Sequence, residues 1–328
     1  MQVGPIKVDA PAVLAPLSGV TDVVFRRIAK RMGAGLVVSE MVASDELVQG
    51  SEEAQLRAEG AGIEPHVVQL AGCEPRWMAE GAKVAEAAGA RIIDINMGCP
   101  AKRVIGGYSG SALMRDLDHA CRLIEATIQA VSVPVTVKMR LGWDHASLNA
   151  PELARRAEAL GVKAVTVHGR TRQQFYKGQA DWTAIAPVVE AVGIPVIANG
   201  DIGSLEEART CLDLSKAKAV MIGRSAVGRP WIVGQIGAAL QERTIPEPAP
   251  SEKTEMALEH YDGLLSLYGA KVGIRHARKH LAAYADAAVE AGFHVAQTVR
   301  TGLVTSDDPT IVMSLLRSLY IHPVREAA

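Results

Sequence analysis

The chain has 328 residues and a nearly balanced charge, with 35 Lys and Arg against 36 Asp and Glu. A formal net charge of −1 excludes binding to nucleic acid through overall positive charge, so any such partner must be held by a local patch. Apolar residues make up 48% of the chain, which is enough for a large core. The length suits one large domain with a small one, or two ordinary domains.

The cysteines and the apolar pattern bear on the compartment of the protein. Cys73, Cys99, Cys121 and Cys211 are widely spaced, with no C-x-x-C pair and no Cys/His cluster of zinc spacing. This usage suits a reducing cytoplasm and predicts no metal site. Residues 1–11 lack an apolar signal core, and no run of about 18 uninterrupted apolar residues occurs. We therefore expect a soluble cytoplasmic protein without membrane contact.

Short apolar runs alternate with amphipathic helical patterns over the first two thirds of the chain. The runs are Ala12–Ala15, Leu36–Met41, His66–Leu70, Ile92–Asn96, Val133–Met139, Ala164–His168, Pro195–Asn199 and Ala219–Ile222. The helical patterns between them include Asp22–Met32, Pro75–Ala88, Asp118–Val131, Pro151–Leu160, Asp181–Val192 and Ser204–Asp213. Nearly continuous apolar runs are typical of parallel strands buried on both faces.

Eight strand–helix units in about 240 residues predict an α/β fold, a closed (β/α)8 TIM barrel. A doubly wound open sheet is the alternative. That fold would use a G-x-G-x-x-G turn after its first strand, and the turn here, Ala15–Gly19, has a different sequence.

A proline-rich segment marks the best domain boundary in the chain. We predict a barrel over residues 1–243, a linker over 244–251 and a small all-helical domain over 252–328. The expected helices of this domain are Glu252–Tyr268, Lys271–Ala285, Val289–Thr301 and Pro309–Leu319.

One thiol stands where a predicted strand ends. Asn96, Gly98 and Pro100 end the fourth apolar run, and Cys99 lies at the tip of this turn. Since the active face of a barrel is built from the carboxyl ends of its strands, Cys99 is a candidate nucleophile or general acid. Free cysteines often only pack in a core, but a Gly-Cys-Pro turn does not suit the interior of a strand.

Further candidate residues lie at the carboxyl ends of the predicted strands or just after them and would meet at the barrel mouth. They are Ser18, Gln69, Asn96, Lys138, Arg140, His168, Arg170, Thr171, Asn199, Gly200, Asp201, Gly223 and Arg224. The loops after strands seven and eight commonly bind phosphate in barrels, and glycine there permits close approach of backbone N–H groups. Gly and Asn are also ordinary turn residues, so the phosphate site depends on both loops together.

Two further residues indicate what this phosphate belongs to. Lys138 lies inside an apolar strand, which indicates an anionic or electron-rich ligand at the mouth. The amide of Gln69 suits the imide edge of a flavin or a pyrimidine. A phosphate site, a lysine, an amide and a histidine around one mouth fit bound flavin mononucleotide (FMN).

At these motifs the chain resembles the tRNA-dihydrouridine synthases, most closely the bacterial B-type enzymes. The matching stretches are Ala15–Asp22, Asp94–Lys102, Gly110–Leu113, Val137–Gly142, Val167–Arg172, Pro195–Ile202, Met221–Arg224 and Ile274–His280 with Tyr284. Residues 96–102 are specific to this family, whereas the two-loop phosphate site is shared by many barrels. The chain departs from the family at Leu17-Ser18, where Met-Ala is more usual, and in the glycine-rich loop after Lys102.

The resemblance implies an FMN-dependent reduction of the C5–C6 double bond of specific uridines in tRNA, driven by NADPH or NADH. The hydride would pass from reduced FMN to C6, and Cys99 would give the proton to C5. Flavin contacts are implied for Pro16, Leu17, Ser18, Gln69, Lys138, His168, Asn199, Gly200, Asp201, Gly223 and Arg224.

Substrate contacts are expected at seven positions, of which Asn96 would hold the uracil. The others are Lys102, Arg140, Arg170, Arg275, Lys279 and His280. Residues 252–328 carry eight Lys and Arg against nine Asp and Glu, so the tRNA signal is the local cluster at residues 275–280. Without the resemblance, this cluster is equally well a solvated helix face. No obligate protein partner is implied.

Three other functions remain open at this point. The nearest is a flavin barrel that reduces a free pyrimidine, similar to the dihydroorotate dehydrogenases, which would need no helical tail. The second is a non-catalytic RNA-binding protein, against which the intact Cys99 and Lys138 argue. The third is a flavin-free barrel that acts on a phosphorylated metabolite.

Overall fold

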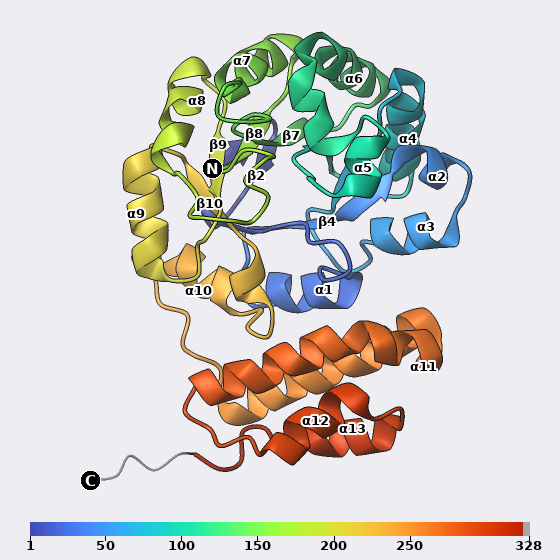
Figure 1. Cartoon of the computed structure of the whole chain (residues 1–328), viewed down its shortest axis with the longest axis vertical. Helices are drawn as coiled ribbons and strands as arrows, with labels where there is room; N and C mark the ends of the chain where they lie inside the picture. The colour runs from blue at the N-terminus through green and yellow to red at the C-terminus, as the bar shows by residue number, and fades with distance from the viewer. Residues whose placement is uncertain (324–328) are drawn as a thin grey trace.

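A computed structural model describes residues 1–323 of the chain (Figure 1). Within these residues, eight parallel strands close into a barrel in the order β10-β3-β4-β5-β6-β7-β8-β9. The strands are β3 (Ala12–Leu14), β4 (Leu36–Ala43), β5 (Val67–Ala71), β6 (Ile92–Met97), β7 (Val135–Arg140), β8 (Ala164–His168), β9 (Val196–Asn199) and β10 (Ala219–Ile222). The predicted TIM barrel and its eight strands are confirmed, and most strand residues are buried, as continuous apolar runs require.

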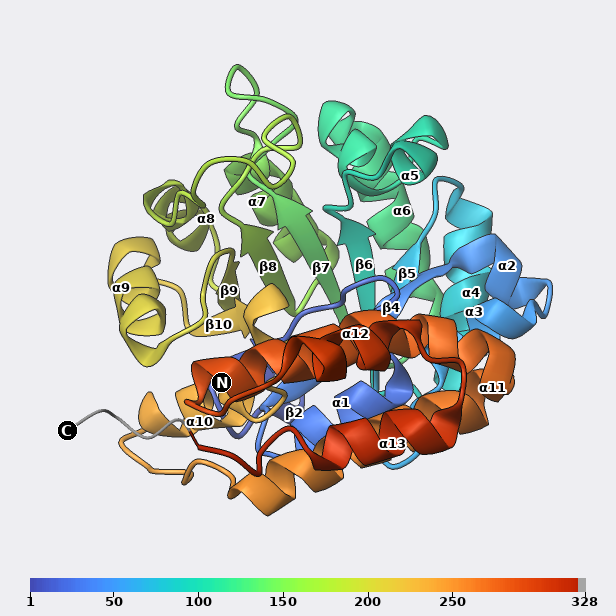
Figure 2. The ribbon, with the colours of Figure 1, turned by 60° about the horizontal axis from the view of Figure 1, so that its bottom comes forward.

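Helices surround the strands (Figures 1 and 2). They are α1 (Val23–Arg31), α4 (Pro75–Ala87), α6 (Leu117–Ala130), α7 (Ala150–Leu160), α8 (Ala186–Ala191), α9 (Leu205–Ser215) and α10 (Ile232–Ala239). Side-chain caps begin several of them: Asp22 accepts from Val24 N and Phe25 N at α1, and Ser204 accepts from Glu207 N at α9. The predicted segment Asp181–Val192 forms a 3-10 turn, η2 (Thr183–Ile185), followed by α8.

Three short helices in the loops after the strands were not predicted from the sequence. They are α2 (Ser44–Val48), α3 (Glu52–Ala58) and α5 (Lys102–Gly106). In Figure 2 the strands point upward, toward the loops that carry α5. The carboxyl ends of the strands therefore form the open end of the barrel.

The opposite end of the barrel is closed by an N-terminal hairpin, β1 (Gln2–Val3) paired with β2 (Ile6–Lys7). Val3 is buried and packs with inward-facing strand residues such as Val13 and Leu36. Because this hairpin covers one end of the barrel, a ligand must enter at the carboxyl ends of the strands.

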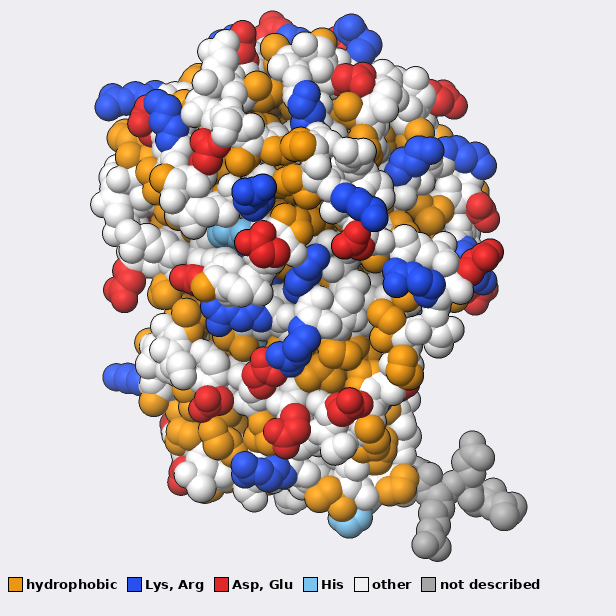
Figure 3. Space-filling view, turned by 180° about the vertical axis from the view of Figure 1, so that it is seen from behind, with side chains coloured by type: hydrophobic (Ala, Val, Ile, Leu, Met, Phe, Trp, Pro, Cys, Tyr) orange, Lys and Arg blue, Asp and Glu red, His pale blue; other side chains and the backbone are white. Residues whose placement is uncertain are grey.

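Figure 3 views the molecule from the side opposite to Figure 1. Positive and negative side chains are interspersed on this face.

The C-terminal segment is helical, with α11 (Pro250–Glu290), α12 (Gln297–Thr305) and α13 (Pro309–Arg317). Gly269, at φ +71°, divides α11 into two halves, which correspond to the two helices predicted there. The prediction of a helix at Val289–Thr301 is wrong in its first half, because Gly292 takes a left-handed φ of +82° just after α11 and α12 begins only at Gln297. None of the described helices combines the length and apolar character needed to cross a membrane.

The helical segment has its own apolar core and is also attached to the barrel. Its core includes Tyr261, Leu281, Tyr284 and Leu316. Met256, at the start of α11, instead packs with the apolar cluster of the barrel. α11 lies beside α1 in both ribbon views (Figures 1 and 2). The helix that follows the first barrel strand is thus the main support of the helical segment.

Candidate active site

A cavity of about 380 Å³ opens at the carboxyl ends of the barrel strands, a size suited to a small-molecule ligand. Most residues predicted for the site line it: Pro16, Leu17, Ser18, Gln69, Asn96, Cys99, Lys138, Arg140, His168, Asn199, Gly200, Asp201, Gly223 and Arg224. The prediction from the sequence missed Met41, Phe175 and Tyr176, which also line the cavity. Phe175 and Tyr176 lie in a long loop after β8 and are exposed, so no strand pattern points to them.

The turn that carries Cys99 is held by hydrogen bonds. Asn96 Oδ1 accepts from Cys99 N at 3.0 Å and from Gly98 N at 3.2 Å. Ser111 Oγ donates to the Cys99 carbonyl oxygen at 2.8 Å. Burial raises the pKa of the Cys99 thiol, against opposing effects of the Ala101 N–H and the charges of Arg140 and Lys138. Cys99 is therefore a protonated thiol at neutral pH, which suits a proton donor.

A buried network fixes the amides beside this turn. Gln69 Nε2 donates to Asp94 Oδ2 at 2.7 Å, and Asn96 Nδ2 donates to Gln69 Oε1 at 2.7 Å. Thr136 Oγ1 donates to the other oxygen of Asp94 at 2.6 Å. These bonds set which end of each amide faces the cavity. Sequence reasoning missed Asp94, although a carboxylate inside the run Ile-Ile-Asp-Ile was a visible signal.

Lys138 reaches into the cavity from β7. Its Nζ donates to Asn199 Oδ1 at 3.1 Å, and Asn199 Nδ2 in turn donates to the Met221 carbonyl oxygen at 2.8 Å. Burial, together with the charge of Arg140, lowers the pKa of Lys138 to about 8. The amine is still mostly protonated at pH 7, and an anionic ligand would stabilise its charge.

The guanidinium of Arg140 is buried and already committed to backbone carbonyls. Its Nε donates to Gly98 O at 2.7 Å, and its NH1 donates to Thr171 O and Phe175 O, each at 2.9 Å. Arg140 lines the cavity, as expected, but it joins the Cys99 turn to the loop after β8. Its main action is therefore to position this turn.

The guanidinium of Arg170 is held in a buried ion pair. Its side chain is 2% exposed and forms a two-pronged ion pair with Asp201, at 2.5 and 3.0 Å. A partner from the next strand loop therefore takes up its guanidinium, and the expected substrate contact of Arg170 stays a prediction. Arg224 also pairs with Asp201, because its Nη2 lies 3.2 Å from Asp201 Oδ1. Two arginines therefore occupy this carboxylate.

The loops after β9 and β10 form the positively charged end of the cavity. Gly200 has φ +120°, and a Cβ there would lie 2.7 Å from Ala180 Cβ and 2.9 Å from the His168 ring. Only glycine fits this close approach. Arg170 and Arg224 share the single carboxylate of Asp201, and Arg140 and Lys138 add further positive charge. This excess of cations favours an anionic ligand.

His168 is neutral at this site. Burial, together with the charges of Lys138, Arg140, Arg170 and Arg224, lowers its pKa well below the ordinary value. Its Nε2 lies 3.3 Å from Arg170 Nη1, which can only donate. We therefore assign the proton to Nδ1.

The predicted tRNA contacts outside the cavity separate into two groups. Lys102, on α5, and Arg275 and Lys279, on the second half of α11, are exposed. Lys279 Nζ lies 3.1 Å from the point that a Cβ on Gly19 would occupy, so it lies against the loop after β3. His280, in contrast, is 2% exposed. Its side chain lies near Asp22 at the start of α1, and the expected tRNA contact of His280 stays a prediction.

These features define a (β/α)8 barrel enzyme with a thiol and an anion-accepting cavity at the carboxyl ends of its strands. Solved structures share this fold. Morphinone reductase in complex with tetrahydroNAD matches with a TM-score of 0.51 at 14% identity, over 77% of this chain and 92% of that one. A 6-hydroxypseudooxynicotine amine oxidase from Pseudomonas geniculata matches with a TM-score of 0.57 at 13% identity, over 81% of this chain and 51% of that one.

Sequence comparison identifies the family. The model of the dihydrouridine synthase (Dus) family matches residues 13–312. A Rhizobium leguminosarum protein named "Probable tRNA-dihydrouridine synthase" is 57% identical over 93% of both chains. A Rhodobacter capsulatus protein of the same name is 52% identical over 98% of both chains. A Xanthomonas axonopodis protein named "tRNA-dihydrouridine synthase B" is 47% identical over 87% of this chain and 86% of its own. The chain belongs to the dihydrouridine synthase family, whose members are oxidoreductases, and the resemblance expected from its motifs is confirmed.

Proposed function

We propose that this chain reduces the C5–C6 double bond of specific uridines in tRNA, with FMN as cofactor and NADPH, or NADH, as reductant of the flavin. The names of its relatives support the tRNA substrate. The observation that carries the proposal is the neutral thiol of Cys99, fixed by Asn96 at a cavity with positively charged walls.

The donor set of the cavity suits FMN. At the phosphate end, Arg224 and the backbone N–H groups around Gly200 and Gly223 would hold the anion. Since the Asp201 carboxylate is occupied by arginines, we expect Asp201 to contribute only its backbone. At the ring end, the available groups are Gln69, Lys138, His168 and Asn199, with Pro16, Leu17 and Ser18 along the side. When bound and reduced, FMN supplies the hydride that C6 of uracil receives.

Cys99 supplies the proton for C5. Hydride addition at C6 leaves negative charge on C5 and O4, and a nearby acid lowers the barrier by giving a proton to C5, which leaves the acid as its conjugate base. A thiol with a raised pKa holds its proton at pH 7, whereas a thiolate could not serve. General acid catalysis typically contributes about 10²–10⁴-fold to the rate. Asn96 and Arg140 keep the thiol in place through the turn that they bind.

The target uridine must leave the stacked tRNA to enter the cavity, at a cost of a few kcal/mol. The exposed aromatic pair Phe175 and Tyr176 at the rim offers surfaces on which a displaced base can stack. Contacts of the Lys102, Arg275 and Lys279 side chains with phosphates of the tRNA backbone would offset the remaining cost of displacing the base. We therefore propose that residues 1–243 form the FMN barrel, residues 244–251 a linker and residues 252–328 a helical domain that binds tRNA. We propose that the whole protein acts in the cytoplasm.

The test uses the purified protein, loaded with FMN and reduced without oxygen. We expect flavin absorption from the protein and rapid reoxidation by tRNA, with dihydrouridine appearing in that tRNA. Free uridine at the same concentration should oxidise it far more slowly. A colourless protein that does not take up FMN would contradict the cofactor, and equal rates with free uridine would favour a small-molecule reductase. Mapping dihydrouridine in tRNA from cells that lack this protein would then identify the positions.

A further inference from the structure

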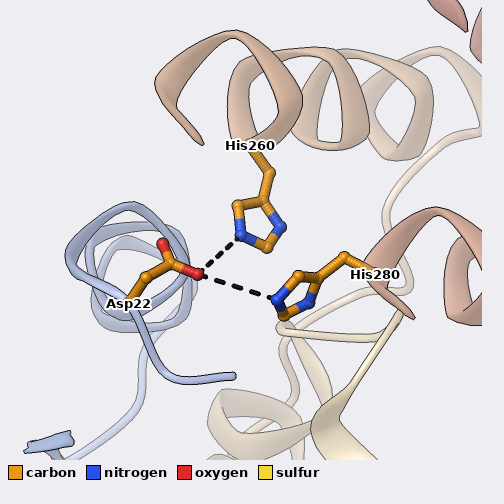
Figure 4. A group of neighbouring side chains, drawn as sticks. All are labelled: Asp22, His260 and His280. Atoms are coloured by element: carbon orange, nitrogen blue, oxygen red, sulfur yellow. Dashed lines mark hydrogen bonds and ion pairs between the residues drawn. The ribbon is translucent and has the colours of Figure 1, made fainter. Parts of the chain in front are cut away.

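A buried cluster joins the helical segment to the barrel outside the cavity. It consists of Asp22, at the start of α1, His260, on the first half of α11, and His280 and Tyr284, on its second half. Figure 4 shows Asp22 with the two histidines. His260 Nε2 lies 3.1 Å from Asp22 Oδ2, and His280 Nε2 lies 3.8 Å from the same oxygen. His260 Nδ1 lies 3.1 Å from the Tyr284 hydroxyl. All four side chains are buried.

The hydrogen bonds of this cluster define an order of donors and acceptors. Asp22 Oδ1 accepts from Val24 N and Phe25 N, each at 3.0 Å. Burial opposes its ionisation, but the charge and hydrogen bond of His260 and the charge of His280 hold the pKa of Asp22 well below its usual range. Since a carboxylate only accepts, His260 Nε2 carries the proton between them. A buried carboxylate without such a donor would be strongly unfavourable.

Asp22 also ends the loop that shapes the cavity. Residues 15–18 and Val20 line the cavity, and this loop is closed on itself by a hydrogen bond from Leu17 N to Thr21 Oγ1, at 2.9 Å. Arg26 Nε holds the Thr21 carbonyl oxygen at 3.0 Å from within α1. Asp22, which accepts the hydrogen bond from His260, therefore directly follows this loop in the chain.

We propose that Asp22, His260 and Tyr284 form a lock through which the helical segment fixes loop 15–21, which makes His260 and Tyr284 positioning residues for the cofactor cavity. The helical segment then has a second task besides tRNA contact. It keeps the loop ordered for FMN even when no tRNA is bound. The turnover part of this inference rests on the proposed function, whereas the order of the loop does not.

A metal ion held by Asp22, His260 and His280 is the competing explanation. No fourth Cys, His, Asp or Glu among residues 1–323 joins these three ligands. A divalent ion would leave an excess positive charge in a dry interior, with one carboxylate to balance it. The 3.1 Å separation of Asp22 and His260 is that of a hydrogen bond and needs no ion.

The test compares four variants of the full-length protein. His260→Ala removes the donor to Asp22, and His260→Gln keeps a side-chain N–H that can reach it. Tyr284→Phe removes one hydroxyl from the lock. Tyr261→Phe is the matched control, because the Tyr261 hydroxyl is buried in the same helical core and has no hydrogen-bond partner among the described residues.

Two measurements need no tRNA: the Kd for FMN and hydrogen exchange of residues 15–21. We expect His260→Ala to weaken FMN binding about tenfold, the scale of one lost hydrogen bond to a buried charge, and to speed exchange in the loop. His260→Gln should restore most of both, Tyr284→Phe should show a smaller change, and Tyr261→Phe should match the unmodified protein. If His260→Ala does not fold, Tyr284→Phe and His260→Gln against Tyr261→Phe decide the question.

Unchanged FMN binding and loop exchange in Tyr284→Phe, and in His260→Ala where it folds, would overturn the lock, even if the KM for tRNA rises. Stoichiometric zinc in the purified holoenzyme that depends on His280 would overturn it in favour of a metal site. Because these readouts do not use turnover, they remain informative if the chain fails to reduce tRNA. Failure of the proposed function would instead appear as an FMN-loaded protein that tRNA cannot oxidise.

Discussion

The barrel mouth and the helical segment both carry clusters of basic and titratable side chains, but they use them differently. At the mouth, Lys138 and Arg224 line a cavity. Asp201 pairs with Arg224, whereas Lys138 donates to the neutral amide of Asn199. In the helical segment, His260 and His280 are buried against Asp22, while Arg275 and Lys279 on the same helix are exposed. Residues close in sequence on one helix therefore attach it to the barrel on one face and leave charged groups free for a substrate on another.

Apart from loss of the thiol itself, the largest effect is expected at the turn that holds it. Asn96→Ala removes the acceptor for Cys99 N and the donor to Gln69, so the thiol and the amide lose their fixed positions. We expect kcat to fall by about 10²-fold, the scale of a small misplacement of a reacting group. Asn96→Asp keeps the acceptor and should retain more activity. Equal kcat in Asn96→Ala and the unmodified protein would show that this turn does not position the reaction.

Lys138 tests the charge at the mouth through pH. Its pKa of about 8 in the ligand-free protein means that the amine is charged below pH 8 and neutral above it. An anionic cofactor binds the charged form better, so FMN affinity should fall as pH rises through about 8 and beyond. Lys138→Met should weaken binding about tenfold at pH 7 and remove this pH dependence. Titration of FMN fluorescence at several pH values measures both, and a pH dependence that survives in Lys138→Met would assign it to another group.

Arg275 and Lys279 test the exposed face of α11. Charge reversal at both positions should raise the KM for tRNA severalfold. The slope of log KM against log salt concentration should fall by about one for each lost phosphate contact. Arg278→Ala is the control on the same helix, because Arg278 is paired with Asp307 at 2.8 Å. Steady-state rates over a range of salt concentrations measure both quantities. An unchanged KM and slope would mean that this face does not bind tRNA.

The exposed ion pair between α1 and α11 should contribute the smallest effect on the stability of the protein. Arg31 pairs with Glu259 at 2.5 Å beside the buried contact of His260, but both side chains are largely exposed. Glu259→Ala should therefore lower the free energy of unfolding by less than about 1 kcal/mol. Denaturant titration gives the value, and a larger loss would mean that attachment of the helical segment depends on surface charge as well as on the buried lock.

The barrel mouth could be predicted from the sequence because each strand ends where its apolar run ends. Cys99 comes just after such a run, Lys138 and Asn199 lie in the last positions of two others, and the closed barrel brings these ends together. The partners of Arg170 and His280 could not be predicted in this way. Asp201 lies 31 positions from Arg170, and Asp22 lies on a helix far from His280 in sequence, so no local pattern links them. Helical periodicity shows that residues 275 and 279 share a face, but not that the face of His280 is covered by α1.

We propose above that the neutral thiol of Cys99 gives its proton to the uracil that is reduced in this cavity. The most direct measurement mixes FMN-loaded, reduced protein with tRNA without oxygen and follows flavin reoxidation in a single turnover. We predict that Cys99→Ala retains FMN and slows this step by about 10²–10⁴-fold. Reoxidation of the Cys99→Ala protein by tRNA at the unmodified rate would contradict the claim.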